Sequence, residues 1–286
     1  MSKSSIQLFW KTITSISIRE IQTLAEQPLK VAIIGNSAAR TEILSDLLNG
    51  DTDILHADKR GVLYPFDVIP EEPETFDIII IANETPTKYP SSVKLYSIKD
   101  IGNWERTADR ILDENPDKVL SLARSLPGFR SKAARKLIQQ TSWINAQFAM
   151  ANALPGAIPF IAPLLPATMV SDMMVLTKNQ AFLSLKLAAI YDKPLDIASR
   201  TPDLLPLFGN AFGWRAIARE IVAVIPGGVG VAARGAIAYA GTSAIGKAME
   251  QFYMNGKLPT TRQIGKYYRE FMGEARTAIA SRMKKH

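Results

Sequence analysis

Residues 29–37 read Leu-Lys-Val-Ala-Ile-Ile-Gly-Asn-Ser, and this stretch decides the fold of the first part of the chain. A short apolar run that enters a glycine-containing turn predicts a buried strand from Leu29 to Ile34. The residues after the turn predict a helix over 38–48, which ends at Asn49-Gly50. A buried strand, a tight turn and a helix in this order form the beginning of a βαβ unit.

Three further segments extend this pattern into a small sheet. Residues 76–82, Phe-Asp-Ile-Ile-Ile-Ile-Ala, show no alternation of polar and apolar side chains, which predicts a strand buried on both faces. Residues 93–98 predict another strand. Residues 64–69 predict an edge strand, because Pro65 cannot donate a hydrogen bond to a neighbour. Strands that alternate with helices indicate a small parallel sheet of the Rossmann-like or P-loop-like kind.

From Trp104 onward the sequence predicts helices only, so we expect an α/β domain followed by a larger, apolar, all-α helical bundle. Asn115-Pro116 and Pro127-Gly128 interrupt the first helical segment. Thr260 or Thr261 is expected to cap the last helix. The other predicted helices cover residues 131–152, 167–191, 212–225, 229–254 and 261–285. The expected domains are 1–28, an N-terminal amphipathic segment; 29–104, the α/β domain; and 105–286, the helical domain.

The helical domain contains 35 consecutive residues without a charged side chain, between Lys136 and Asp172. This length raises the question of a membrane span. Four prolines within residues 154–166 exclude one continuous helix and predict an apolar loop or re-entrant turn. The helices over 167–191 and 229–254 each contain three charged residues, which disfavour a simple span. Shallow embedding or a compact bundle remains compatible with this pattern.

The N-terminal segment has apolar residues at roughly helical spacing, including Ile6, Phe9, Trp10 and Ile13. It fits an amphipathic helix at a membrane interface. A helix that docks on the protein's own core explains the same spacing and is favoured here. The segment lacks the uninterrupted apolar run of a secretory signal, so we expect a protein on the cytoplasmic side of a membrane, with a purely cytoplasmic location as the alternative.

Composition narrows the possible chemistry. The chain has no Cys and two His, His56 and His286, which argues against thiol catalysis, a His-rich metal site and a Ser-His-Asp triad. Residues 31–104 carry a net charge of −6 and residues 105–286 a net charge of +11. A basic, strongly apolar half favours anionic lipid over nucleic acid as a partner, because basic runs interleaved with aromatic residues are missing. Attraction between the two halves is the simpler alternative.

The turn after the first strand is the candidate site for a phosphate group, formed by Gly35, Asn36, Ser37, Arg40 and Thr41. A P-loop requires a second glycine and a Lys-Ser/Thr pair. In a loop one residue shorter than the standard P-loop, Arg40-Thr41 would occupy the position of that pair. The second glycine is missing with either loop length. Residues 83–86, Asn-Glu-Thr-Pro, likewise lack the Lys and Asp of a guanine-reading motif. We therefore expect a degenerate nucleotide-binding-like domain without hydrolysis, and no catalytic residue, metal or cofactor.

A second candidate is a polar stripe in the helix predicted over 167–191. Asp172, Asn179 and Lys186 are spaced by seven and share one helix face, with Lys178 and Gln180 adjacent to it. The stripe is either a buried polar site between helices or a face exposed to water, and exposure is favoured. Asp172 and Lys186 lie about 21 Å apart along an ideal helix, so they cannot pair.

Two further patterns concern packing and surface charge. Alanines recur every four residues from Ala232 to Ala248, with glycines nearby, and this small-residue ridge predicts close helix packing. Five basic residues precede the uncharged stretch and could face anionic headgroups, or form an ordinary solvated helix face. These residues are Arg124, Arg130, Lys132, Arg135 and Lys136.

The helical half resembles the bacterial "domain of unknown function 697" over roughly residues 120–275. The resemblance rests on residues 146–149 (Ala-Gln-Phe-Ala), 154–159 (Leu-Pro-Gly-Ala-Ile-Pro), 176–180 (Leu-Thr-Lys-Asn-Gln), 187–191 (Leu-Ala-Ala-Ile-Tyr) and 236–242 (Ala-Ile-Ala-Tyr-Ala-Gly-Thr). That family is similar to segments found after Era-type GTPase domains, and its members are often described as membrane proteins. The resemblance implies membrane association and an α/β neighbour, and it carries no catalytic residue.

These observations together predict a non-catalytic, membrane-associated protein with a vestigial GTPase-like domain. It would act through anionic lipid, a protein partner or a second copy of itself. Two alternatives stay open. One is a switch or NTPase that binds GTP or ATP at residues 35–41, and the other is a soluble adaptor with a buried helical core.

Overall fold

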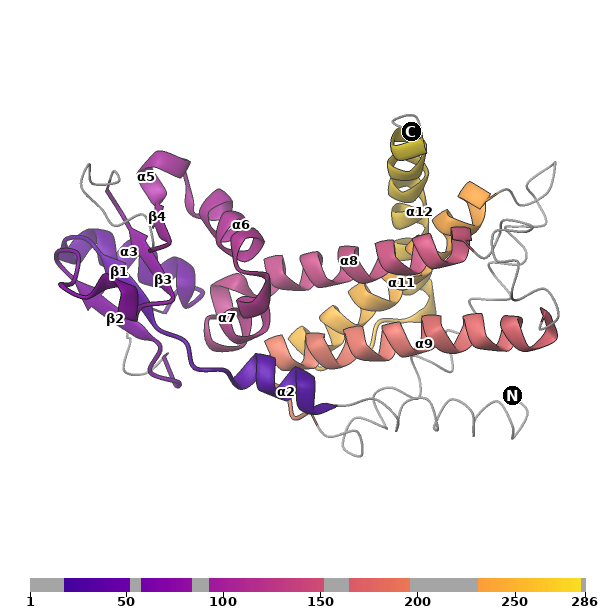
Figure 1. Ribbon diagram of the computed structural model, residues 1–286, viewed down its shortest axis with the longest axis horizontal. Coiled ribbons are helices and arrows are strands. Elements are labelled where there is room, and N and C mark those ends of the chain that lie inside the picture. The colour runs from indigo at the N-terminus through magenta and orange to yellow at the C-terminus, as the bar shows by residue number, and fades with distance from the viewer. Residues whose placement is uncertain (1–17, 52–57, 84–92, 152–164, 196–230, 284–286) are drawn as a thin grey trace. The chain divides into compact units, whose positions relative to one another are not determined.

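The computed structural model describes residues 18–51, 58–83, 93–151, 165–195 and 231–283 (Figure 1). The N-terminal segment up to residue 17, most of the apolar turn over 154–166 and the helix predicted over 212–225 lie outside the described residues. The chain divides into two compact units. The α/β unit comprises Arg19–Arg135 and Ala189–Lys193, and the helical unit comprises Met1–Ile18, Lys136–Ala188 and Pro194–His286.

The α/β unit is built on a four-stranded parallel sheet in the order β2-β1-β3-β4. Its strands are β1 (Val31–Ile34), β2 (Leu63–Phe66), β3 (Ile78–Ile81) and β4 (Leu95–Ser97). All residues of the central strands β1 and β3 are buried, as expected for a strand covered on both faces. The sequence prediction of an α/β sheet followed by mainly helical structure is therefore confirmed.

Strand β2 forms one edge of the sheet, as Pro65 predicted. The backbone N–H of Val31 bonds the carbonyl oxygen of Val62 at 2.8 Å, so the N–H groups of residues 63 and 65 point away from β1. The N–H of Leu63 donates to Asp58 Oδ2 at 2.7 Å, and Pro65 has no N–H. These outward N–H positions of the edge strand are therefore closed to an added strand.

Short helices connect the strands and continue beyond them. They are α2 (Ile18–Glu26), α3 (Ser37–Leu47), η1 (Pro73–Thr75), α5 (Ile98–Ile101), α6 (Trp104–Glu114), η2 (Pro116–Lys118), α7 (Val119–Ser125) and η3 (Pro127–Phe129). The breaks at Pro116 and Pro127 fall where the sequence predicted them, because each proline starts a new turn. Gly128 packs so closely on the end of α3 that a Cβ atom there would lie 2.0 Å from the carbonyl oxygen of Asp46.

The helical unit contains most of α8 (Arg130–Ala151) and α9 (Leu165–Ile190), together with α11 (Val231–Asn255) and α12 (Thr261–Met283). The small-residue ridge on α11 is buried at Ala236, Ala240, Ala244 and Ala248. A Cβ at Gly246 would lie 2.8 Å from Ile138 Cγ1, which shows how closely α11 approaches α8. In the part of the chain that the structure describes, no helix is both long and apolar enough to cross a bilayer.

The last helix begins with a capping box. The backbone N–H of Thr260 donates to Gln263 Oε1 at 2.8 Å, and the N–H of Gln263 donates to Thr260 Oγ1 at 3.3 Å.

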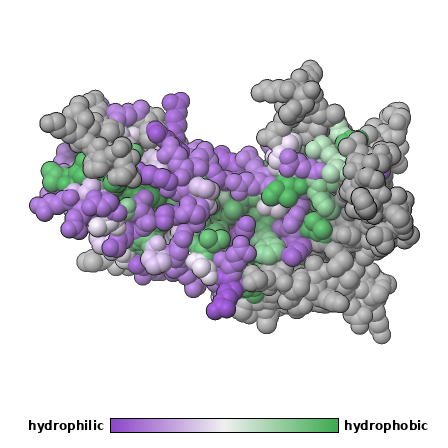
Figure 2. Space-filling model, viewed as in Figure 1, coloured by the Kyte–Doolittle hydropathy of each residue, from purple (hydrophilic) through white to green (hydrophobic). Residues whose placement is uncertain are grey.

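The surfaces of the two units differ on the face seen in Figure 2. Hydrophilic residues cover most of the described surface of the α/β unit, and hydrophobic residues are more frequent over the helical unit.

Candidate functional site

The turn between β1 and α3 is only two residues long. β1 ends at Ile34 and α3 begins at Ser37, so only Gly35 and Asn36 connect them. Gly35 has a φ of 155°, and a Cβ there would lie 3.3 Å from the Cβ atoms of Ala39 and Ala82. Glycine is therefore favoured by the backbone conformation, and a side chain there would also be tightly packed. Two residues are too few for the longer loop whose successive N–H groups surround a phosphate in a P-loop.

The polar groups of this turn bond mainly to the helix that follows them. Asn36 caps α3, because its Oδ1 accepts the N–H of Ala39 at 2.9 Å. Thr41 Oγ1 donates to the carbonyl oxygen of Ser37 at 2.9 Å. Asn36 thus has the role of a helix cap, and Thr41 lies in the second turn of α3 rather than at its start.

Arg40 bridges the turn and the end of the neighbouring strand. Its Nη1 donates to the carbonyl oxygen of Gly35 at 2.8 Å and forms an ion pair with Asp67, the residue directly after β2. The Arg40 side chain is 21% exposed and the Asp67 side chain 81% exposed. The guanidinium that would face a phosphate therefore already has an acidic partner, and that partner is exposed to solvent.

The other two strands end at the same edge. The N–H of Ala82 donates to the carbonyl oxygen of Ile34 at 3.1 Å, and Ser97 Oγ donates to the carbonyl oxygen of Asn83 at 2.6 Å. Ser97 also caps α5 by accepting the N–H of Asp100. The carboxyl ends of the four parallel strands thus bring together Gly35, Asp67, Asn83 and Ser97. In open parallel sheets this edge is where ligands bind. Residues 84–86 of the expected base-reading segment lie outside the described residues.

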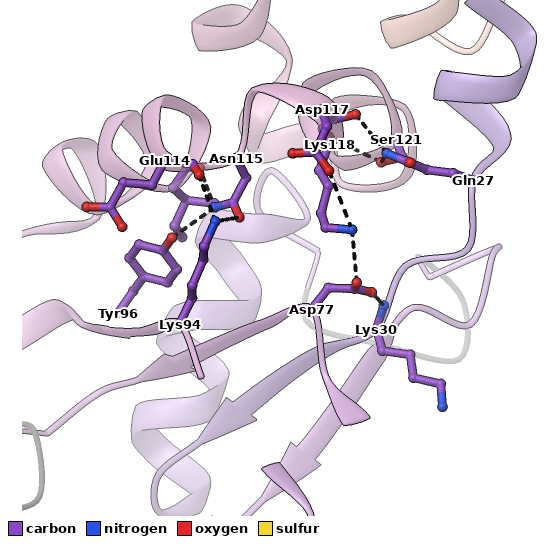
Figure 3. Close-up of polar contacts among 11 residues, drawn as sticks. Gln27, Lys30, Asp77, Lys94, Tyr96, Glu114, Asn115, Asp117, Lys118 and Ser121 are labelled. Carbon is purple, nitrogen blue, oxygen red and sulfur yellow. Dashed lines mark hydrogen bonds and ion pairs between the residues drawn. The ribbon is translucent and has the colours of Figure 1, made fainter. Parts of the chain in front are cut away.

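The opposite, amino edge of the sheet is joined to α6 and α7 by polar side chains (Figure 3). Asp77 precedes β3, and its Oδ2 accepts the N–H of Lys30 at 2.8 Å while its Oδ1 pairs with Lys118 Nζ at 2.9 Å. Gln27 Nε2 donates to Ser121 Oγ at 3.1 Å. These contacts attach the end of α2, η2, α7 and the start of β1 to one edge.

Asn115 is the buried centre of the second group in Figure 3, with 1% of its surface exposed. Its Nδ2 donates to the Tyr96 hydroxyl at 2.8 Å and to the carbonyl oxygen of Ile111 at 2.7 Å, and its Oδ1 accepts from Lys94 Nζ at 2.9 Å. Burial raises the pKa of Tyr96 to about 12. Hydrogen bonding from Arg110 lowers the pKa of the neighbouring Glu114. The group fixes α6 to β4.

The polar stripe of α9 is divided by its surroundings. Asn179 Nδ2 donates to Oδ1 of the fully buried Asn145 at 2.7 Å, and Asn145 Nδ2 donates to Thr242 Oγ1 at 2.9 Å. Lys178 is exposed and lies 5.8 Å from the centre of the Phe182 ring. Gln180 and Lys186 are half-buried, and Asp172 lies within α9, although its side chain is outside the described set. Asn179 is thus the member of the stripe that enters a polar contact between α8, α9 and α11.

Four of the five basic residues before the uncharged stretch have partners within the α/β unit. Lys132 Nζ lies 3.1 Å from Asp109 Oδ2 and has only 5% of its side chain exposed. Arg135 also pairs with Asp109, at 3.6 Å, and Arg124 Nη2 lies 3.3 Å from Asp192 Oδ1. Arg130 Nε donates to the carbonyl oxygen of Ala123, and burial lowers the pKa of Arg130. The structure therefore uses most of this basic set for internal contacts.

Sequence reasoning identified Gly35 and Arg40 but missed Asp67, Ser97 and Asn145. Asp67 directly follows β2 and Ser97 ends β4, but the predicted strands extended to residues 69 and 98, so the sequence placed both residues within strands and gave no signal for either. Asn145 gave no signal, because its partners on α9 and α11 are 34 and 97 residues away. Comparison with models of protein families, with curated proteins and with solved structures finds no match to the chain.

Proposed function

We propose that this chain is a non-catalytic, membrane-associated protein that acts through contacts with lipid or with a protein partner. Its α/β unit is a P-loop-like or Rossmann-like domain that has lost hydrolytic activity, and its helical unit is a bundle that associates with a membrane. The proposal combines the geometry of the Gly35 turn, the interior of the helical unit and the resemblance of residues 120–275 to a family of membrane proteins.

The absence of hydrolysis is supported by the Arg40–Asp67 ion pair. A hydrolytic site of this type needs a free cation for the β- and γ-phosphates and a carboxylate that holds Mg²⁺. In the described structure the cation nearest the turn neutralises the carboxylate nearest to it. The two-residue turn also lacks the longer loop of successive N–H donors, so two elements of such a site differ from those of a hydrolytic P-loop.

Membrane association is supported chiefly by how the helices of the helical unit contact one another. Ser243 Oγ donates to Ser142 Oγ at 2.8 Å, and Ser184 and Tyr253 share a hydrogen bond of 3.1 Å. Uncharged hydrogen bonds between helices, beside a ridge of small residues, are the means by which helices associate in lipid. This interior adjoins, along the chain, a sequence of 35 residues that carries no charge.

Fractionation tests the proposal directly. The full chain is expressed, and membranes are collected by ultracentrifugation and washed with high salt or with alkaline carbonate. The proposal expects recovery in the membrane pellet before washing. Retention through both washes indicates embedding, and release by salt indicates a peripheral basic surface. Recovery in the supernatant from the start contradicts membrane association and favours the soluble adaptor.

A nucleotide-binding switch is the second candidate, favoured by the strand order. In the order β2-β1-β3-β4, the chain leaves β1 towards β2 on one side and leaves β3 towards β4 on the other side. The Gly35 turn lies at this change of direction, which is the usual ligand position in such sheets. Calorimetry of the full chain with GTP or ATP and Mg²⁺ separates this candidate from the first. We expect no heat of binding, and measurable binding that is lost in Gly35→Val would instead favour the switch.

A further inference from the structure

Helix α12 has two sides of different character. Ile264, Tyr268 and Ala275 are buried, and the helix packs on α11. Four basic residues occupy the other side: Arg262, Lys266, Arg269 and Arg276, all exposed. At about 100° per residue they fall within about 80° of the helix circumference, and the centre of this arc lies about 135° from the centre of the buried side. We call these four residues the α12 basic row.

The α12 basic row is scarcely neutralised by neighbouring acids. Lys266 Nζ lies 3.8 Å from Glu270 Oε1, on the adjacent flank of the helix. Within the part of the chain that the structure describes, Arg262, Arg269 and Arg276 form no ion pair. This contrasts with Lys132 and Arg124, whose charges are balanced inside the α/β unit. In the described part of α12, three exposed arginines without an ion pair therefore lie in one row.

The geometry of the row selects the kind of anion it fits. From Arg262 to Arg276 the row extends about 21 Å along a straight helix, as a line of long side chains rather than a cavity. Such a line matches an extended anionic surface better than a single small anion. The neighbouring aromatic residues Tyr267 and Tyr268 are half-buried and buried, so they are not available to stack on bases, which argues against single-stranded nucleic acid.

We propose that the α12 basic row binds the anionic headgroups of a membrane and thereby sets which side of the helical unit faces the lipid surface. The inference rests on the proposed membrane association and adds to it a surface and a lipid class. Basic residues on one helix face gain affinity for acidic lipids within a Debye length of the surface, and that gain falls with salt. Residues 124–136, the basic set singled out in the sequence, are not the contact surface.

The test uses vesicle flotation of the full chain with pure phosphatidylcholine vesicles and with vesicles that contain phosphatidylglycerol. The test variant is Arg262→Gln, Lys266→Gln, Arg269→Gln and Arg276→Gln combined. Glutamine keeps helix propensity and the replaced side chains are exposed, so the fold is retained, which circular dichroism checks. The control variant removes the same charge from exposed residues of the α/β unit: Arg19→Gln, Lys30→Gln, Lys59→Gln and Arg106→Gln combined.

Wild type is expected to prefer the anionic vesicles, and the preference should decrease as salt increases. The test variant should lose that preference by on the order of 100-fold, whereas the control variant should keep most of it. Equal loss in both variants would overturn the α12 assignment and leave a diffuse effect of net charge. An unchanged test variant would also overturn it, with membrane association intact.

Two other outcomes separate the two proposals. If wild type floats with neither vesicle type, the proposed membrane association fails and the α12 assignment fails with it. If wild type shows no preference for anionic vesicles but binds a fluorescent oligonucleotide at physiological salt, and the test variant loses that binding, the row is a nucleic-acid surface and the lipid assignment is wrong. A phosphate titration at constant ionic strength distinguishes headgroup binding from capture of the free anion, since free phosphate should then not displace the protein from vesicles.

Discussion

The two units of this chain hold their helices in place by different means. In the α/β unit charged side chains join the elements, as Lys118 does with Asp77 at 2.9 Å and Arg124 with Asp192 at 3.3 Å. In the helical unit the buried contacts between helices include hydrogen bonds between uncharged groups, such as that of Asn145 with Thr242, beside closely packed glycine and alanine, and the buried Glu250 pairs with Lys247 within α11. Ion pairs at a surface weaken with salt, whereas buried neutral bonds do not. The comparison therefore predicts different sensitivities for the two units.

Adding a methyl group at a close-packed glycine should give the largest effects. In Gly128→Ala the new Cβ would meet backbone atoms of α3, with the Asp46 carbonyl oxygen at 2.0 Å, and we expect about 3 kcal/mol of destabilisation in the α/β unit. Gly246→Ala meets side chains of Ile138 and Leu183 that can shift, so about 1–2 kcal/mol is expected in the helical unit. Hydrogen exchange resolved by segment measures each unit separately.

The matched control is Gly241→Ala, where no atom lies within 4 Å of the added Cβ. This substitution should be neutral or stabilise α11 by roughly 0.5–1 kcal/mol, because alanine has the higher helix propensity. If Gly128→Ala were as harmless as Gly241→Ala, the tight contact between η3 and α3 would not exist in solution.

Removing the hub of the buried polar contacts should be the next largest effect. Asn145→Ala leaves the hydroxyl of Thr242 and the amide of Asn179 without their buried partner, and we expect a loss of about 2 kcal/mol in the helical unit. Urea unfolding at low and at high salt should give the same loss. For contrast, Asp77→Asn in the α/β unit removes one charge, and its smaller loss should shrink as salt increases. Equal salt dependence for both variants would contradict the difference between the units.

A buried tyrosine in each unit provides a comparison by pH. Burial raises the pKa of Tyr96 in the α/β unit and of Tyr268 in the helical unit to about 12, from an ordinary value of 10.0. The unfolded chain releases these protons at lower pH than the folded chain does. Their contribution is therefore intact below pH 10 and is lost as the pH rises towards 12, by roughly 1–2 kcal/mol for each tyrosine.

The measurement follows tyrosinate absorbance and unfolding together between neutral pH and pH 12. Tyr96→Phe should reduce the alkaline sensitivity of the α/β unit and leave that of the helical unit, and Tyr268→Phe should do the reverse. Titration of either phenol near its ordinary pKa, in folded protein, would show that it is not buried.

Local chemistry made much of the fold predictable from sequence. The apolar run before Gly35, the prolines at 116 and 127, and the Thr260 cap each determine backbone conformation within a few residues, and the structure has strands, breaks and a helix start at these places. Pro65 predicted an edge strand for the same reason, because the missing N–H is a property of the residue itself.

Contacts between distant segments were not predictable in this way. Arg40 was recognised as a departure from a P-loop, but its partner Asp67 lies 27 residues away, at the end of a different strand. The polar stripe of α9 was visible by its spacing of seven. Which of its members turns inward depends on Asn145 and Thr242, and helical periodicity carries no record of which helices will be neighbours.

The smallest expected effect concerns the carboxyl edge, and it bears on the interpretation of Arg40. Because Asp67 is 81% exposed, its ion pair with Arg40 should contribute no more than about 0.5–1 kcal/mol. Asp67→Asn should therefore barely change the free energy of unfolding of the α/β unit, while it frees the Arg40 guanidinium from its acidic partner.

If the ion pair is what excludes anions from the Gly35 turn, calorimetry should detect weak pyrophosphate binding to Asp67→Asn and none to wild type. Binding to Asp67→Asn that persists in the double variant Arg40→Gln, Asp67→Asn would assign the anion to another site. If neither wild type nor Asp67→Asn binds pyrophosphate, the ion pair is not what excludes the anion. The two-residue turn, in which Asn36 caps α3, is then sufficient to exclude it.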